Sequence, residues 1–346
     1  MRTCQALSVH IGVRYVSLTK SHRAAGLLAA LLLLLAAVAL SLALGARQLT
    51  LSDAWRGLVD ESAAGYTVVH QMRLPRTLLG LLAGAALGLA GGLMQALTRN
   101  PLADPGLLGV NAGAAAAVVT AIGLLGITSL SGYVWFAFAG AALVSVLVWA
   151  VGGGRGATPV RLALAGTAVN AALYAYVTAV QLLDTASLDR MRFWTVGSLA
   201  AAQPSTVAAV APFIAAGVLL TAVLARPLNV LMLGDDSARA LGARPTRTRA
   251  WAVAAVTLLC GAATAACGPI IFVGLMVPHL VRPLTGPDLR WLLPYCAVLA
   301  PLALLGADVL GRTVARPGEV PGGVVTAVLG GAFFLAVVRR ARLVAA

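Results

Sequence analysis

The sequence predicts an all-α polytopic membrane protein, and composition is the main reason. Of its 346 residues, 60% are hydrophobic and only 10% are charged, whereas soluble domains carry about 25% charged residues. The apolar residues are gathered into runs of about 20, the length that an α-helix needs to cross the hydrocarbon core of a bilayer. A surface this poor in charge cannot be solvated by water, so most of it is expected to face lipid.

About ten transmembrane helices fit this length, because spans of about 20 residues are joined by short loops. An even number of spans places both ends of the chain on one side. If that side is the cytoplasm, 17 of the 25 Lys and Arg residues lie inside, as the positive-inside rule requires. The orientation is therefore N-in, C-in, with expected spans at 24–44, 74–98, 107–124, 132–151, 161–183, 205–225, 250–267, 271–284, 291–310 and 321–338.

The first apolar run follows a basic segment and could be mistaken for a signal peptide. Residues 24–44 are longer than a cleavable apolar region of about 7–15 residues, so we interpret them as a retained span. Residues 1–23 are then a cytoplasmic extension, 24–340 a single transmembrane domain, and 341–346 a cytoplasmic tail.

The second span carries glycines at every fourth residue. This spacing places them on one helix face, where the missing side chains let a second helix approach closely in lipid. The same stripe also occurs in ordinary Gly/Ala-rich membrane helices, so by itself it predicts packing and no particular function. Its members are Gly80, Gly84, Gly88 and Gly92.

The connection 226–249 is the longest and most charged of the predicted cytoplasmic loops. Residues 235–241 are expected to form a short amphipathic helix, with Asp235 and Asp236 favourable at its N-terminus and Gly242 ending it. A simple topology anchor would explain the arginines of this loop. It would not explain the pattern GDDxARxLG, which favours a docking element.

Three of the arginines on the predicted outer side lie directly beside a span, against the orientation rule. Arg73 and Arg76 precede the second span and Arg312 follows the ninth. They could form a socket for an acidic partner, since arginine binds carboxylates in bidentate fashion, or they could reach lipid headgroups. Asp308 precedes Arg312 by four residues and is expected to pair with it.

The sequence lacks groups that would power transport or catalyse a reaction. A phosphate-binding GxxxxGK[ST] loop needs a lysine, and Lys20 stands without the glycines. His279 has no second ligand at metal-binding spacing, so neither a metal site nor an intramembrane enzyme is predicted. The spans hold no carboxylate relay, which counts against an ion-driven secondary transporter. Basic runs interleaved with aromatics are also missing, so nucleic-acid binding is not expected.

Five motifs in this order resemble those of the FecCD-type permease family, the transmembrane subunits of type II ABC importers for iron–siderophores, haem and cobalamin. The resemblance covers about residues 24–340. The motifs are RLPR at 73–76, GxxMQ…NPLADPxLLG at 91–109, GDDxARxLG at 234–242, GPIxFVGLxxPHxxR at 268–282 and GAD…R…EVPxGxxTAxxG at 306–330.

The resemblance implies a ten-helix type II importer fold in a bacterial cytoplasmic membrane. It implies a second permease subunit (a copy of this chain or a paralogue), two cytoplasmic ATPase subunits that hold ATP and Mg²⁺, and an external solute-binding protein. No cofactor is expected on this chain. By resemblance, Arg73, Arg76 and Arg312 receive acidic residues of the binding protein, and Asn100 and Leu102 help close the cytoplasmic mouth. The ATPase would contact Gly234, Asp235, Asp236, Ala238, Arg239, Leu241 and Gly242.

The resemblance leaves the substrate open among ferric siderophores, haem and cobalamin. A ferric siderophore is favoured because it is the commonest substrate of the family. Two features depart from the family pattern: residues 1–23 are longer than it needs, and Arg316 adds a cation where small or apolar residues are usual. The second departure bears on how the binding protein docks.

Overall fold

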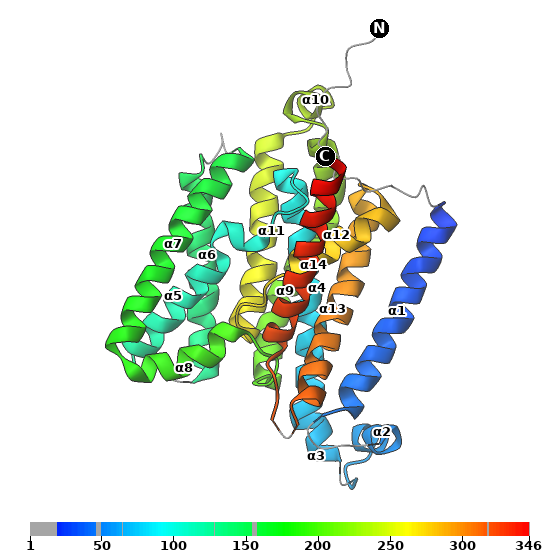
Figure 1. Cartoon of the computed structure of the whole chain (residues 1–346), viewed down its shortest axis with the longest axis vertical. Coiled ribbons are helices and arrows are strands. Elements are labelled where there is room, and N and C mark those ends of the chain that lie inside the picture. Colours follow the sequence, from blue (N-terminus) through cyan, green and yellow to red (C-terminus); the bar gives the residue numbers. More distant parts are fainter. Residues whose placement is uncertain are drawn as a thin grey trace.

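The structure is a computed structural model that describes residues 19–45, 50–63, 65–127, 129–153, 158–316 and 318–345. In these residues the regular structure is helical throughout (Figure 1). Most of the expected N-terminal extension, residues 1–18, lies outside the described part of the chain. Residue 20 already belongs to the first helix.

The long helices agree closely with the expected spans, and several shorter helices join them. In chain order the elements are α1 (Lys20–Ala43), α2 (Leu51–Val59), α3 (Tyr66–Val68), the π-helical η1 (Val69–Arg73), α4 (Leu74–Thr98), the 3-10 helix η2 (Pro105–Leu108), α5 (Val110–Gly123), α6 (Leu130–Val151), α7 (Pro159–Leu183), α8 (Thr185–Val196), α9 (Pro204–Met232), α10 (Asp235–Ala240), α11 (Pro245–Cys267), α12 (Val273–Thr285), α13 (Leu289–Val314) and α14 (Gly322–Ala345).

Seven helices of the described chain are long and apolar enough to cross a membrane: α1, the continuous helix Tyr66–Thr98, α6, α7, α9, α11 and α13. Two shorter apolar helices accompany them, α5 and the first part of α14. The eighth expected span is the 13-residue α12, the shortest of the ten, as the Gly268-Pro269 break suggests. The total of ten crossings and the N-in, C-in orientation stay predictions.

The loop expected at 226–249 is mostly helical, which corrects the sequence analysis. α9 continues through Pro227 to Met232, and α11 begins at Pro245. A proline inside a membrane helix is tolerated when neighbouring groups satisfy the freed backbone, and a proline in the first turn of a helix costs no hydrogen bond. The connection between α9 and α11 therefore consists of α10 and the short turns on either side of it.

The amphipathic helix α2 was not among the elements predicted from the sequence. Thr50 and Asp53 form a reciprocal cap at its start: the Thr50 hydroxyl accepts from the Asp53 backbone N–H at 3.1 Å, and the Thr50 N–H donates to the Asp53 carboxylate at 3.3 Å. This capping box is a recognised signal for a helix N-terminus. At the other end of the chain, the expected tail 341–346 continues α14 as far as Ala345.

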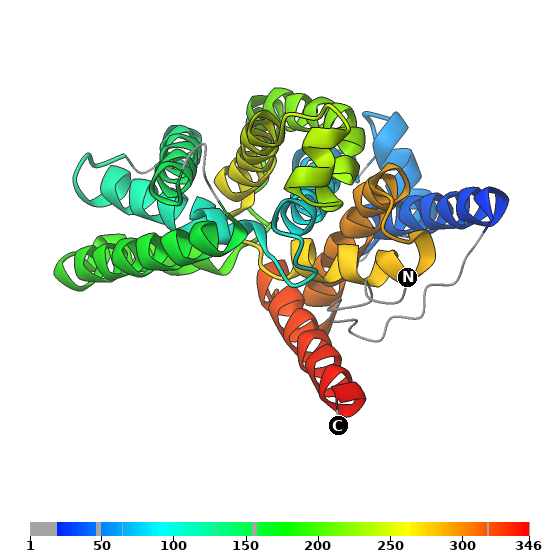
Figure 2. The same ribbon diagram turned by 90° about the horizontal axis from the view of Figure 1, so that it is seen from above.

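α4 lies at the centre of the bundle and packs against α9, α11, α12 and α13 (Figures 1 and 2). Its glycine stripe faces α13. A Cβ at Gly84 would lie 2.4 Å from Pro301 Cα, and one at Gly88 would lie 2.6 Å from the Cys296 carbonyl oxygen. Gly80 and Gly92 face leucine side chains of α13. The backbones of α4 and α13 are therefore in direct contact along the stripe.

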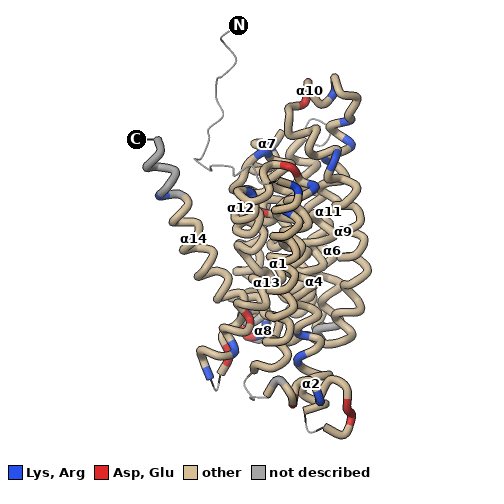
Figure 3. Tube along the Cα trace, turned by 90° about the vertical axis from the view of Figure 1, so that its right-hand side faces the viewer, with Lys and Arg blue, Asp and Glu red and all other residues tan. Residues whose placement is uncertain are grey.

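The charged residues gather toward the two ends of the bundle, and few lie in its middle (Figure 3). One end carries α10, the start of α1 and the end of α14; we call it the α10 end (Figure 1). The opposite end carries α2 and the start of α4, and we call it the α2 end. The two described chain ends thus lie on one side, as an even number of spans requires.

We expect Gly84→Ala to destabilise the bundle by about 1–3 kcal/mol, because the added methyl group meets α13 backbone that cannot move aside. Gly306→Ala is the matched control: this glycine lies within α13, and its added Cβ would meet nothing within 4 Å. The control should be neutral or stabilising by up to about 1 kcal/mol. Unfolding of the purified protein, followed by tryptophan fluorescence, measures both. Equal effects would contradict the packing argument.

Candidate functional site: the charged ends of the helix bundle

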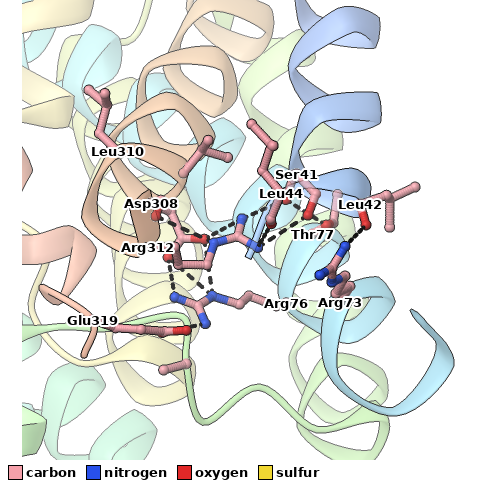
Figure 4. A network of polar contacts seen from close by, with 12 residues as sticks. Ser41, Leu42, Leu44, Arg73, Arg76, Thr77, Asp308, Leu310, Arg312 and Glu319 are labelled. Atoms are coloured by element: carbon pink, nitrogen blue, oxygen red, sulfur yellow. Dashed lines mark hydrogen bonds and ion pairs between the residues drawn. The ribbon is translucent and has the colours of Figure 1, made fainter. Parts of the chain in front are cut away.

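At the α2 end, the buried Asp308 of α13 joins two arginines (Figure 4). Arg76 donates to it through Nε at 3.0 Å and Nη2 at 2.9 Å, and Arg312 Nη2 lies 2.9 Å from its Oδ2. Arg76 also donates Nη1 to Glu319 at 2.8 Å. The Asp308 side chain is 0% exposed and the Glu319 side chain 31%. The pairing of Asp308 with Arg312 expected from their spacing is confirmed.

The outer arginines also bind the end of α1. Arg312 Nη1 donates to the Leu44 carbonyl at 2.9 Å, and Arg73 Nη1 donates to the Ala43 carbonyl at 2.7 Å. The last carbonyls of a helix have no partner within that helix, and a positive charge near them is favourable. Arg73 and Arg312 therefore attach the C-terminus of α1 to α4 and α13.

The structure thus brings Arg73, Arg76 and Arg312 together but buries all three, at 5%, 9% and 2% exposure. Each guanidinium bonds groups of its own chain, so the docking role stays a prediction. Glu319 is the part-exposed member of the cluster, and the sequence analysis did not single it out although it lies in the quoted EVP motif. Arg316, which is close to Glu319 in the sequence, is exposed.

At the α10 end, the helix expected at 235–241 is present as α10. It is bounded by Gly234 at φ +110° and Gly242 at φ +78°. Left-handed backbone of this kind strongly favours glycine. Ala238 is fully buried, whereas the Asp236 side chain is fully exposed and Leu241 is 65% exposed. The exposed surface of α10 therefore carries the ion pair of Asp236 with Arg239, and the exposed Leu241 follows it directly.

Asp235 points back into the protein. Arg249 of α11 donates Nη2 to its Oδ1 at 2.7 Å and Nη1 to its Oδ2 at 2.9 Å, and Arg99 donates to Oδ1 at 2.5 Å. The hydrogen bond from Arg249 and the weaker one from Arg99 lower the pKa of this carboxyl below its usual range. Asp235 is thus an anion that ties α10 to α11 and to the end of α4. Arg99 and Arg249 were expected only as topology charges.

Arg99 also connects α10 to the loop that is predicted to close the cytoplasmic mouth. It ends α4 in the left-handed region at φ +51° and donates to the Leu231 carbonyl at 3.0 Å. Asn100 follows directly, and its side-chain oxygen accepts from the Leu102 N–H at 2.9 Å. This turn fixes the start of the loop. The structure therefore places Asn100 and Leu102 at the same end as α10; their role as a gate stays a prediction.

His279 lies within α12 and packs edge-on against Phe333 of α14, with ring centroids 5.7 Å apart. Among the described residues, no group of three or more His, Cys, Asp or Glu could hold a metal ion. His279 therefore serves the packing of α12 against α14.

Comparison with known proteins places this geometry in a family. The model of the FecCD transport family matches residues 32–340, which is most of the chain. The chain belongs to the FecCD transport family. It is 47% identical to the ferric enterobactin transport system permease protein FepD of Escherichia coli, with 94% of this chain and 97% of FepD covered.

The similarity to other relatives also covers most of both chains. The Fe(3+)-citrate import system permease protein YfmD of Bacillus subtilis is 39% identical over 90% of this chain and 94% of its own length. The hemin transport system permease protein HmuU of Yersinia pestis is 38% identical over 90% of this chain and 95% of its own length. A solved structure described as a metal-chelate type ABC transporter in an inward-facing conformation matches with TM-score 0.83 and 28% identity, over 92% of this chain and 99% of that chain.

Asp308→Asn should destabilise the α2 end by about 3–5 kcal/mol, because it leaves two buried guanidiniums without their shared anion. Glu319→Gln is the control, since this part-exposed partner of Arg76 should contribute only about 0–1 kcal/mol. Thermal unfolding in detergent compares the two variants. A small and equal effect of both would show that Asp308 does not hold the cluster together.

Asp235→Asn should loosen α10 by about 1–2 kcal/mol, because the neutral side chain keeps its shape but loses charge-assisted bonds from Arg99 and Arg249. Asp236→Asn removes the same charge one residue further on, where the side chain is fully exposed and contacts only Arg239. Hydrogen–deuterium exchange of the peptide 232–243 should rise in the first variant alone. Equal exchange in both would contradict the inward role of Asp235.

Proposed function

We propose that this chain is the membrane-spanning permease subunit of an ATP-binding-cassette importer that carries a ferric siderophore into the cytoplasm. The observation that carries the proposal is the 47% identity to FepD over nearly the full length of both chains. The helical bundle, with charge confined to its two ends, supports it. In this proposal the path across the bilayer lies between two permease subunits, because the middle of this bundle is filled by α4, and the two ends of the bundle meet the other partners.

Energy comes from a separate ATPase in this proposal, because the chain has no lysine-containing phosphate-binding loop of its own. ATP and Mg²⁺ are then held by two ATPase subunits on the cytoplasmic side. Asp236 and Leu241 on the exposed face of α10 meet the ATPase, while Asp235 on the inner face passes its movement to Arg99. The loop with Asn100 and Leu102 begins at the next residue and opens or closes the cytoplasmic mouth.

At the α2 end the proposed partner is an external solute-binding protein with acidic contact residues. Arg76 is the arginine best placed for it, because its Nη1 bonds the part-exposed Glu319. A carboxylate of the partner would replace Glu319 there. Arg73 and Arg312 support the contact by holding α1 in place. The remaining proposed partner is a second permease subunit, either another copy of this chain or a paralogue.

Haem is the second candidate substrate, because HmuU of Yersinia pestis is 38% identical over 90% of this chain. Cobalamin is the third, from the resemblance of the motifs alone. An ion-driven secondary transporter is the alternative from another class. Asp308 already pairs with two arginines of its own chain, so it does not provide the free intramembrane carboxylate that an ion-driven transporter would use.

The test has two parts. In a strain that lacks this chain, uptake of radiolabelled ferric enterobactin, hemin and cobalamin is measured with and without the restored gene, and the first should recover. In liposomes, the chain alone should accumulate no substrate, whether or not an ion gradient is present. With its ATPase and binding protein it should accumulate substrate on addition of ATP. Ion-driven accumulation by the chain alone would overturn the proposal.

A further inference from the structure

A groove of about 600 Å³ runs between α9 and α13 in the half of the bundle nearer the α10 end. Leu89 of the central helix α4 lines it, and aliphatic side chains such as Val218, Val223, Leu293 and Ala297 form its walls. Figure 2 places α9 on the side of the bundle away from α14. The groove is separate from the two charged clusters and takes no part in the function proposed above.

Both helices that form the groove carry a proline at its level. Pro227 lies within α9 and Pro294 within α13. A proline has no N–H, and its ring clashes with the carbonyl four residues earlier, which bends the helix. Those residues are Val223 and Arg290, and both line the groove. The carbonyls of these two residues therefore lack their usual helical N–H donor.

Two arginines line the groove in addition to its apolar side chains. Arg226 of α9 is exposed and makes no ion pair with any residue that the structure describes. Arg290 of α13 donates Nε and Nη2 to Asp288, at 3.0 and 2.8 Å. These bonds orient Arg290 and offset one positive charge. Arg226 and Arg290 both line the groove, and the pairing of Arg290 with Asp288 leaves these three charged groups with a net charge of +1.

The occupant must match an aliphatic channel that ends in cationic groups. Val218 and Arg226 are about 12 Å apart along α9 at 1.5 Å per residue, a distance suited to the upper part of an acyl chain. Arg226 and Arg290 suit a phosphate at the level of lipid headgroups, because arginine binds phosphate through several N–H donors at once. Basic pockets between membrane helices on the cytoplasmic side bind anionic headgroups in this way.

We propose that this groove binds an anionic glycerophospholipid. One acyl chain lies along α9 and α13 over Leu89, and the phosphate lies against Arg226 and Arg290. The net charge of the site selects an anionic lipid over a zwitterionic one. A bound lipid fills the gap between α9 and α13, and so supports the helix that leads directly into α10.

Native mass spectrometry of the purified full chain with phosphatidylglycerol or phosphatidylcholine tests the proposal. Wild-type protein should bind phosphatidylglycerol more tightly. The variant R226Q/R290Q should lose about fivefold in affinity for each arginine, with phosphatidylcholine binding unchanged. R161Q/R247Q is the matched control, since it removes two exposed arginines at the same end but outside the groove, and it should bind as wild type does.

A second variant separates the groove from general charge attraction. Ala222 is exposed and lines the groove, so Ala222→Trp should fill the acyl channel and lower phosphatidylglycerol binding at least fivefold with both arginines present. Equal losses in the two double-arginine variants would overturn the proposal in favour of diffuse attraction. Full binding by Ala222→Trp, or displacement of the lipid by millimolar inorganic phosphate, would overturn it in favour of a headgroup or free-phosphate contact without the groove.

Discussion

The contact between the backbones of α4 and α13 is the interaction on which the rest of this molecule depends. In a bilayer, lipid chains are as apolar as leucine, so helices associate through close packing and through bonds between polar groups. The glycines of α4 allow such packing, since at Gly84 and Gly88 even a methyl group would meet α13 backbone. α4 is thus the central helix of the bundle, and α9, α11 and α12 also pack against it.

The polar ends of the bundle follow from this arrangement. Because α4 and α13 are locked together, Arg76 at the start of one and Asp308 near the end of the other meet inside the protein. The same two helices supply the arginines that hold the end of α1. At the opposite end, Arg99 ends α4 and meets Asp235 of α10. One rigid helix therefore joins a charged cluster at each end of the bundle, which is a suitable arrangement for passing movement across a membrane.

Much of this was predictable from the sequence because it depends on local pattern. Apolar runs predicted the long helices, most of them with ends within four residues of those observed, although α9 and α14 extend seven residues further. The four-residue spacing predicted the glycine face of α4, and the four-residue separation predicted the pair of Asp308 and Arg312. The extension of α9 through Pro227 was not predictable by these rules, because a proline normally argues against a helix and only its surroundings decide whether it is tolerated.

The sequence by itself determined that this is a helical membrane protein of the FecCD family with no phosphate-binding loop, since composition and motifs are properties of the chain alone. Only the tertiary structure decided where the charges point. It turned Asp235 inward and Asp236 outward, buried the three arginines that were expected to form a docking socket, and opened a groove beside Arg226. The physical reason is that burial and partner choice depend on residues far apart in the chain. Arg76 and Asp308 are separated by 232 positions, so no local sequence pattern predicts that they are in contact.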